Sequence, residues 1–285
     1  MQANHKQMLL GPSLVAVFLL SSPLHAQSYE GRRAELKIAL SEALKGTQAS
    51  AVVLDQKAAG TLAEIEPARR GLPGSAIKPL LLAYALSHHI VLEDTQVYCR
   101  RNLRVAGRAL PCTHPADEPR FTAERALAES CNTWFAEMGK RYSGAQLEDA
   151  LRLWHLPHQP MTGANLEDRQ LVALGLQGVT ASPLELAQAY RELLAVEQAD
   201  GVVVHGLLDS VSYGMARPAA VPGVAILGKT GTASDPGQAW THGWFAGGIP
   251  GRLVLVIYVP HGDGGTAASL AQKFFAHLAA ESGAR

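Results

Sequence analysis

The stretch PGSAIKP, residues 73–79, sets a serine and a lysine three positions apart at the start of an apolar segment. The apolar residues that follow predict a helix from Ser75 to Ser87. Three residues are nearly one helical turn, so Ser75 and Lys78 are expected on one face. A lysine whose pKa is lowered by burial can take the proton of a serine hydroxyl and make it a nucleophile. A helix cap followed by a solvated lysine would produce the same pattern, so the rest of the chain must decide.

A second motif is Ser130-Cys131-Asn132. The hydroxyl of Ser130 can relay a proton, and the amide of Asn132 can hold a substrate amide. The motif falls inside residues 122–142, which predict one continuous helix with Thr122 as its cap. Polar residues on an ordinary helix are therefore the alternative interpretation.

A third motif is Lys229-Thr230-Gly231-Thr232, at the start of a predicted strand. A lysine and hydroxyl groups bind carboxylates, and an edge strand can pair with an extended peptide. Gly231 would leave room for a close approach of that peptide. A strand that simply begins at a turn is the alternative.

The hydrophobic pattern predicts an α/β protein with strands at both ends of the chain and a helical middle. Both terminal helices can pack on one sheet, and the helical middle forms a second lobe beside a cleft. Helices are expected at 32–45, 75–87, 122–142 and 267–280, and strands at 51–54, 61–65, 228–234, 242–248 and 252–260. For His242, at the start of one of these strands, a surface position is favoured over one that faces the cleft.

Composition narrows the possible functions. Lysine plus arginine equals aspartate plus glutamate, at 25 each, so no net charge draws the protein to nucleic acid. With 47% hydrophobic and 18% charged residues, the chain is expected to fold into a globular enzyme.

The N-terminus has the features of an export signal. A short polar start precedes an apolar run from Met8 to Leu20, and small residues lead to a cleavage point after Ala26. The expected organisation is a signal peptide at 1–26 and a catalytic domain at 27–285, with the helical lobe at roughly 75–215. The protein is expected outside the cytoplasmic membrane, in the periplasm or its equivalent. A retained membrane anchor is the less favoured alternative, because the run is short for a membrane span.

The three motifs, in this order, resemble the signature set of penicillin-binding proteins and serine β-lactamases. The likeness extends to ALAESCNTWF at 126–135, QGVTASP at 177–183, GKTGTA at 228–233 and GWFAG at 243–247. The resemblance covers residues 50 to 280 and implies the transpeptidase fold. That fold has an antiparallel sheet flanked by N- and C-terminal helices, plus an all-helical lobe.

The resemblance also implies the chemistry of each position. Ser75 would attack the D-Ala–D-Ala amide of a peptidoglycan stem peptide, with Lys78 as base. Ser130 and Lys229 would carry protons and charge, and Asn132 would orient the acyl side chain. No cofactor is expected for catalysis, and β-lactams are expected as covalent inhibitors.

Substrate carboxylate binding is assigned by the same resemblance to Thr230 and Thr232, with Gly231 between them. The N–H of Thr232 would complete an oxyanion site with that of Ser75.

The three cysteines leave two possibilities open. A Cys99–Cys112 disulfide suits an oxidising compartment, with Cys131 buried as a small apolar residue. Alternatively, the three thiols and either His114 or Glu118 make a structural zinc site. Some elongation-type penicillin-binding proteins carry a metal beside the second motif, at spacings similar to those of Cys112, Glu118 and Cys131. The expected set is therefore Cys99, Cys112, Glu118 and Cys131.

Other functions of the same fold stay open. About 48 residues precede Ser75 after the signal, too few for the pedestal of large penicillin-binding proteins, so a stand-alone domain is expected. A class D-like β-lactamase is one alternative, although Glu167 and Asp168 are interpreted as ordinary surface carboxylates. A non-catalytic penicillin-binding sensor or scaffold is another. A partner in cell-wall synthesis is expected without being identified.

Overall fold

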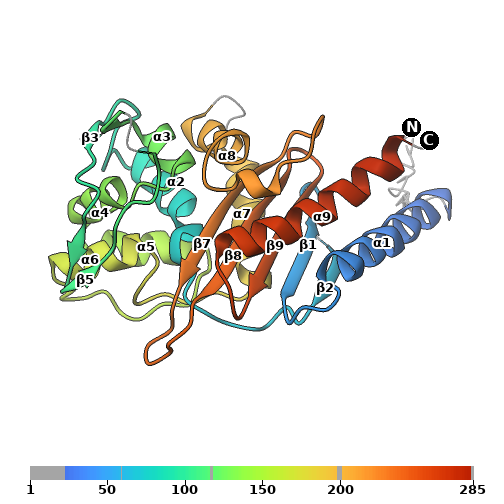
Figure 1. Cartoon of the computed structure of the whole chain (residues 1–285), viewed down its shortest axis with the longest axis horizontal. Coiled ribbons are helices and arrows are strands. Elements are labelled where there is room, and N and C mark those ends of the chain that lie inside the picture. The colour runs from blue at the N-terminus through green and yellow to red at the C-terminus, as the bar shows by residue number, and fades with distance from the viewer. Residues whose placement is uncertain (1–22, 59, 116–117, 198–200, 284–285) are drawn as a thin grey trace, which may run out of the picture.

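A five-stranded antiparallel sheet forms the centre of the molecule (Figure 1). The computed structural model describes residues 23–58, 60–115, 118–197 and 201–283. Both ends of the chain contribute strands, in the spatial order β2-β1-β9-β8-β7, so β7 lies at an edge. The strands are β1 (Ser50–Asp55), β2 (Thr61–Ile65), β7 (Leu227–Ala233), β8 (His242–Ile249) and β9 (Leu253–Val259).

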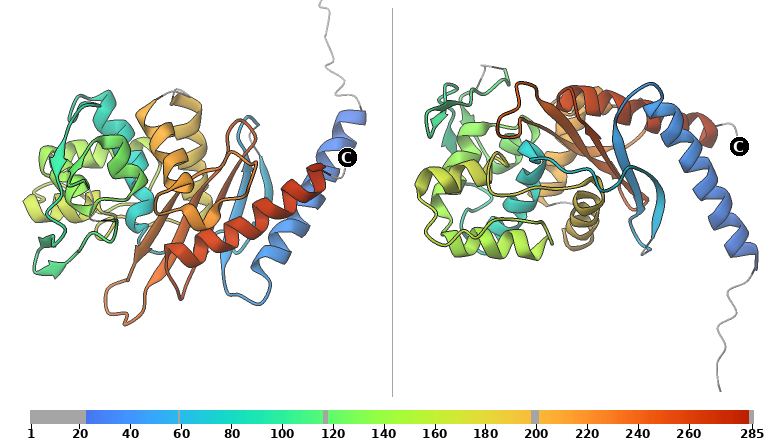
Figure 2. Two further views of the ribbon diagram at one scale, coloured as in Figure 1. Left: turned by 45° about the horizontal axis from the view of Figure 1, so that its top comes forward. Right: turned by 90° about the horizontal axis from the view of Figure 1, so that it is seen from below.

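The two faces of the sheet pack against different helices. Along β1, Val52 and Leu54 join one apolar cluster, whereas Ala51 and Val53 join the other, because successive strand side chains point to opposite faces. The second cluster is covered by the terminal helices α1 (Pro23–Leu44) and α9 (Gly264–Gly283). Figure 2 shows these two helices side by side on that face.

The helical lobe lies between β2 and β7 in the chain and packs on the other face of the sheet. Side-chain oxygens cap several of its helices, as at Ser143, Asn165 and Ser182, each within a capping box. The helices are α2 (Lys78–Ser87), α3 (Ala123–Ala128), α4 (Asn132–Arg141), α5 (Gly144–Leu153), α6 (Leu166–Ala173), α7 (Pro183–Val196) and α8 (Val202–Ser212), preceded by the 3₁₀ turn η1 (Gly74–Ile77). A second 3₁₀ turn, η2 (Arg217–Ala219), packs against α9 on the opposite face.

Two short ribbons accompany these helices and were not predicted from the hydrophobic pattern. Each strand has only two residues, too few to show alternation. The pairs are β3 (Val97–Tyr98) with β6 (Arg120–Phe121), and β4 (Arg104–Val105) with β5 (Arg108–Ala109).

The predicted fold class is confirmed, but the single helix predicted at residues 122–142 is wrong. Residues 122–142 form two helices, because Ser130 adopts a left-handed backbone with φ of 56° between α3 and α4. Thr122 caps α3 as expected, by accepting a hydrogen bond from the N–H of Arg125. The second motif is therefore a turn that leads into α4, with Asn132 as the first residue of that helix.

The predicted export signal falls mostly on residues 1–22, which lie outside the described part of the chain. Among the helices described, none combines the length and apolar character that crossing a membrane requires.

Candidate active site

Ser75 lies in η1, immediately before α2. Its side chain is half-buried, whereas Gly74, Ala76 and Ile77 around it are buried. Gly74 has φ of 52°, and a Cβ atom there would lie 2.6 Å from the carbonyl oxygen of Thr232. Only glycine fits this position, since it combines a left-handed backbone with close contact to another chain segment. The residue preceding Ser75 therefore fixes the serine against β7.

The third motif supplies the other side of this contact. A Cβ atom on Gly231 would lie 2.3 Å from the carbonyl oxygen of Pro73 and 2.9 Å from the backbone nitrogen of Ala76. Thr230 is buried, and the hydroxyl of Thr232 accepts a hydrogen bond from the N–H of Gly264 at 2.9 Å. The edge strand β7 is thus held between the Ser75 turn and the start of α9.

Lys78 is fully buried, with no exposed side-chain surface. Its Nζ donates to the carbonyl oxygen of Ser130 at 3.0 Å and to Oδ1 of Asn132 at 2.8 Å. The ring of Phe135 lies 4.9 Å away. Burial lowers the pKa of Lys78 to about 8, against an opposing effect of the Cys131 and Cys112 thiols. A neutral amine is therefore accessible near neutral pH.

Ser130 joins this lysine to the one on β7. The left-handed turn brings Ser130 Oγ to 3.3 Å from Lys78 Nζ and 2.8 Å from Lys229 Nζ. Lys229 also donates to the carbonyl oxygen of Thr230 at 3.1 Å. Burial and the nearby charge of Lys78 hold the pKa of Lys229 well below its ordinary value. The structure thus brings Lys78, Ser130, Asn132 and Lys229 into one hydrogen-bonded group.

A second cluster lies directly behind the Ser130 turn and consists of Cys99, Cys112, His114 and Cys131. All four side chains are buried, and their ligand atoms lie within 4.8 Å of one another. The three cysteines are free thiols, with Sγ–Sγ distances of 3.4 Å for Cys99–Cys112 and 3.9 Å for Cys112–Cys131. Tetrahedral zinc with Zn–S bonds of about 2.3 Å separates its sulfur ligands by about 3.8 Å.

The imidazole of His114 is oriented for this cluster. Its Nδ1 lies 2.8 Å from the carbonyl oxygen of Pro115, which can only accept, so Nδ1 carries the proton. The lone pair of Nε2 then faces Cys99 Sγ at 3.4 Å. Histidines that bind metals are commonly oriented by such a bond on their other nitrogen. The donor set fits a structural zinc ion.

Glu118 is not brought into this cluster. It is exposed, and its carboxylate accepts a hydrogen bond from the backbone N–H of Arg120 at 2.9 Å. His114, the other residue considered from the sequence, takes the position. The two carboxylates considered for a β-lactamase also have structural partners, Ala106 N–H for Glu167 and Asn165 N–H for Asp168.

The surface position expected for His242 is wrong. The side chain is 1% exposed, and its Nε2 lies 2.8 Å from the carbonyl oxygen of Leu72, which also accepts from Trp244 at 2.9 Å. The N–H of Leu72 donates to Asp235. The segment before Ser75 is therefore held on both sides by residues of β8 and of the loop after β7. The sequence contains no local signal for this contact, because it joins positions 170 residues apart.

Comparison with known proteins supports one family. The model of the penicillin-binding protein transpeptidase domain matches residues 50–280. Among solved structures, the D,D-transpeptidase domain of a peptidoglycan glycosyltransferase from Eggerthella lenta has a TM-score of 0.75 at 18% identity, over 88% of this chain and 82% of that one. The corresponding domain of Burkholderia pseudomallei penicillin-binding protein 3 has a TM-score of 0.74 at 17% identity, over 90% and 95%.

A peptidoglycan glycosyltransferase from Burkholderia ambifaria is similar as well, with a TM-score of 0.73 at 18% identity, over 90% of this chain and 96% of that chain. At these identities, the structural likeness establishes the fold. No curated protein matches the sequence.

Proposed function

The chain belongs to the penicillin-binding protein transpeptidase family, and on that premise we propose that it is a serine acyltransferase acting on D-Ala–D-Ala stem peptides of peptidoglycan. The observation that carries the proposal is the hydrogen-bonded group of Lys78, Ser130 and Lys229, which is joined to the Ser75 turn by the backbone bond from Lys78 N–H to the carbonyl oxygen of Ser75. It provides a base of lowered pKa, a hydroxyl relay and a second cation in one site.

In the proposed mechanism, Ser75 Oγ attacks the carbonyl carbon of the penultimate D-alanine, and neutral Lys78 takes its proton. The backbone N–H groups of Ser75 and Thr232 bind the developing oxyanion. Ser130 gives its proton to the departing amide nitrogen and regains one from the lysines. The C–N bond breaks, D-alanine leaves, and an ester joins the substrate to Ser75.

An amine or water then attacks this ester. An amine acceptor gives a cross-linked peptide, whereas water gives a shortened one. Thr230, Thr232 and Lys229 bind the substrate carboxylate, and Asn132 orients the acyl chain. The substrate class places the proposed reaction outside the cytoplasmic membrane, in keeping with the export signal expected at 1–26.

Intact mass spectrometry with benzylpenicillin tests the proposal. Protein comprising residues 27–285 should gain one drug mass that persists for hours, and the Ser75→Ala variant should gain none. An adduct that disappears while the drug is hydrolysed would identify a β-lactamase instead. A stable adduct without turnover of any D-Ala–D-Ala peptide would identify a sensor. Folded protein that forms no adduct would refute the acyltransferase proposal.

We also propose that Cys99, Cys112, His114 and Cys131 hold one structural zinc ion. Three thiolates and a neutral imidazole are a usual ligand set for such sites. When bound, the ion would cross-link the loop bearing Cys99 and Cys112 to the turn between α3 and α4. Because Cys131 lies between Ser130 and Asn132, that cross-link would fix the second motif relative to Lys78. The ion takes no part in the proposed reaction.

A further inference from the structure

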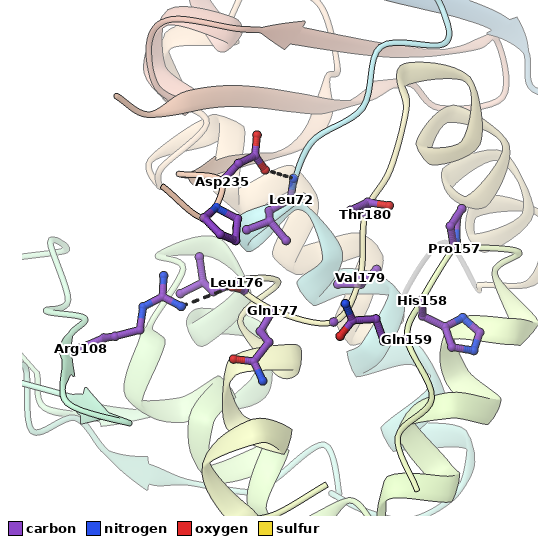
Figure 3. A pocket seen from close by; sticks show the side chains of 12 residues that line it. Leu72, Arg108, Pro157, His158, Gln159, Leu176, Gln177, Val179, Thr180 and Asp235 are labelled. Carbon is purple, nitrogen blue, oxygen red and sulfur yellow. Dashed lines mark hydrogen bonds between the residues drawn. The ribbon is translucent and has the colours of Figure 1, made fainter. Parts of the chain in front are cut away.

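Side chains hold the backbone of Leu72, which lies three positions before Ser75. Its N–H donates to the carboxylate of Asp235 in the loop after β7, as Figure 3 shows. Its carbonyl oxygen lies 2.8 Å from His242 Nε2 and 2.9 Å from Trp244 Nε1, both on β8. A carbonyl oxygen has two lone pairs and can accept from both rings at once. The peptide group after Leu72 therefore cannot turn without losing a hydrogen bond.

The chain between Leu72 and Ser75 has little freedom to absorb a shift. Pro73 has a φ of −71° that its own ring fixes. Gly74 has a φ of 52°, and its N–H donates to the carbonyl oxygen of Gly175 at 3.0 Å. A displacement of the Leu72 carbonyl is therefore passed on to the serine turn.

The imidazole of His242 acts on this carbonyl through one nitrogen. The side chain is buried, and its ring centroid lies 5.4 Å from that of Tyr258. Because the carbonyl oxygen of Leu72 can only accept, Nε2 carries the proton. Nδ1 faces Asp235 Oδ2 at 3.6 Å and has no hydrogen-bond partner among the residues that the structure describes. The bond to Leu72 is therefore the hydrogen bond that orients this ring.

A buried histidine that only filled space would not be needed as a donor here, because Trp244 already satisfies the Leu72 carbonyl. A second donor adds direction, since it fixes the rotation of the peptide group as well as its distance. Attack on a carbonyl carbon is sensitive to placement, and a displacement of about 1 Å can slow a reaction by about 100-fold. We propose that His242 is a positioning residue, which holds the Ser75 hydroxyl in place for acylation through the Leu72 carbonyl. This role rests on the proposed function of Ser75.

Two amide variants of His242 separate the hydrogen bond from the rest of the ring. The amide nitrogen of His242→Gln reaches the place of Nε2 and can donate to Leu72, whereas that of His242→Asn is one methylene short. Both variants lose the aromatic ring and bury one amide group, so their effects on packing are similar. Stopped-flow acylation by benzylpenicillin gives the dissociation constant Kd, the acylation rate constant k2 and the amplitude for each protein.

The expected result is a loss of rate in one variant only. His242→Gln should keep k2 within about threefold of the wild type. His242→Asn should lower k2 by about 10- to 100-fold, because the serine turn is less well placed, while Kd changes by less than about threefold. His88→Asn is the matched control and should keep Kd, k2 and the amplitude. His88 is an exposed histidine whose Nδ1 likewise lies 3.0 Å from a carbonyl oxygen, that of Tyr84, at the far end of α2.

A merely structural role would give a different result. Fewer folded molecules would lower the amplitude in both variants without changing k2 of the molecules that react. That result, or an equal loss of k2 in His242→Gln and His242→Asn, would overturn the positioning role. Wild-type protein that benzylpenicillin does not acylate would overturn the proposed function as well, whereas acylation with the same k2 in all variants would overturn the positioning role alone.

NMR of the wild type keeps the test decisive if His242→Asn does not fold. The Nε2 proton of His242 and the Nε1 proton of Trp244 point at one oxygen, so a nuclear Overhauser effect should join them. An unprotonated Nε2, or the absence of this effect, would overturn the positioning role.

Discussion

Lys78 and Lys229 share one hydroxyl group, since Ser130 Oγ lies 3.3 Å from the first Nζ and 2.8 Å from the second. Both lysines are fully buried, so two ammonium groups here would repel each other in a medium of low dielectric constant. A hydroxyl can accept a hydrogen bond from one amine and donate to the other. The arrangement therefore favours one neutral amine, which a base for Ser75 requires.

The pH dependence of acylation follows from this pair. Lys78 accepts the proton of Ser75 only as a neutral amine, and burial lowers its pKa to about 8. Below that pH the lysine is protonated and the rate should fall about tenfold per unit. Above it the rate should level off. The second-order acylation rate with benzylpenicillin, measured from pH 6 to 9.5, checks this profile, and a rate constant over the whole range would contradict it. Lys78→Arg, which stays protonated, should lose at least about 100-fold at every pH.

The backbone and the hydroxyl of Ser130 can be tested separately. Ser130→Ala and Ser130→Gly both remove the relay, so each should slow acylation by about 10² to 10⁴. Their stabilities should differ, because alanine keeps a Cβ atom at φ of 56° and glycine does not. The glycine variant should be about 1 kcal/mol more stable than the alanine variant in urea denaturation. Equal stabilities would argue against a strained turn, and retained acylation would argue against the relay.

The close packing of β7 on the Ser75 turn makes a third prediction. Gly231→Ala would place a methyl group 2.3 Å from the carbonyl oxygen of Pro73, where backbone leaves little room to yield. The substitution should destabilise the protein by about 1–3 kcal/mol and slow acylation by tenfold or more. Gly31→Ala, on an open face of α1, meets no atom within 4 Å, so it should keep acylation and lose no stability, since alanine favours a helix more than glycine does. Unchanged melting temperature and acylation in Gly231→Ala would show that the contact has no consequence.

Most of the sheet was predictable from sequence because β1 and β9 are apolar runs, and proline–glycine turns separate the last three strands. The break at Ser130 was not, since residues 122–142 contain no proline and only Gly139, near the far end. Local propensity favours a continuous helix there. The left-handed turn is instead accompanied by tertiary contacts, with Lys78 and Lys229 on the Ser130 hydroxyl and Cys131 in the cysteine cluster.

The site was predictable in the same uneven way. Ser75 and Lys78 lie close together through helical spacing, whereas the meeting of Ser130 with Lys229 joins residues 99 positions apart. Only the order of the three motifs, which resembles that of penicillin-binding proteins, predicted that Ser130 and Lys229 share one site. For the cysteine cluster, spacing could not choose between His114 and Glu118, which lie in the same loop. Burial decides between the two residues, since the His114 imidazole is buried at the cluster and the Glu118 carboxylate is exposed.

The assignment of His114, and not Glu118, as the fourth zinc ligand gives the last prediction. Wild-type protein should carry about one zinc ion per chain by elemental analysis, and cobalt(II) should substitute with the charge-transfer absorption of thiolate ligands. His114→Asn should lose at least tenfold in metal affinity, because it removes one of four ligands. Glu118→Gln, the matched control on the same loop, should bind as wild type does, since its exposed carboxylate accepts from the backbone N–H of Arg120 and lies outside the cysteine cluster. Metal loss in Glu118→Gln with retention in His114→Asn would reverse the assignment. If mass spectrometry finds a metal-free protein with a Cys99–Cys112 disulfide, the zinc assignment is wrong, and the disulfide that the sequence left open as the alternative is correct.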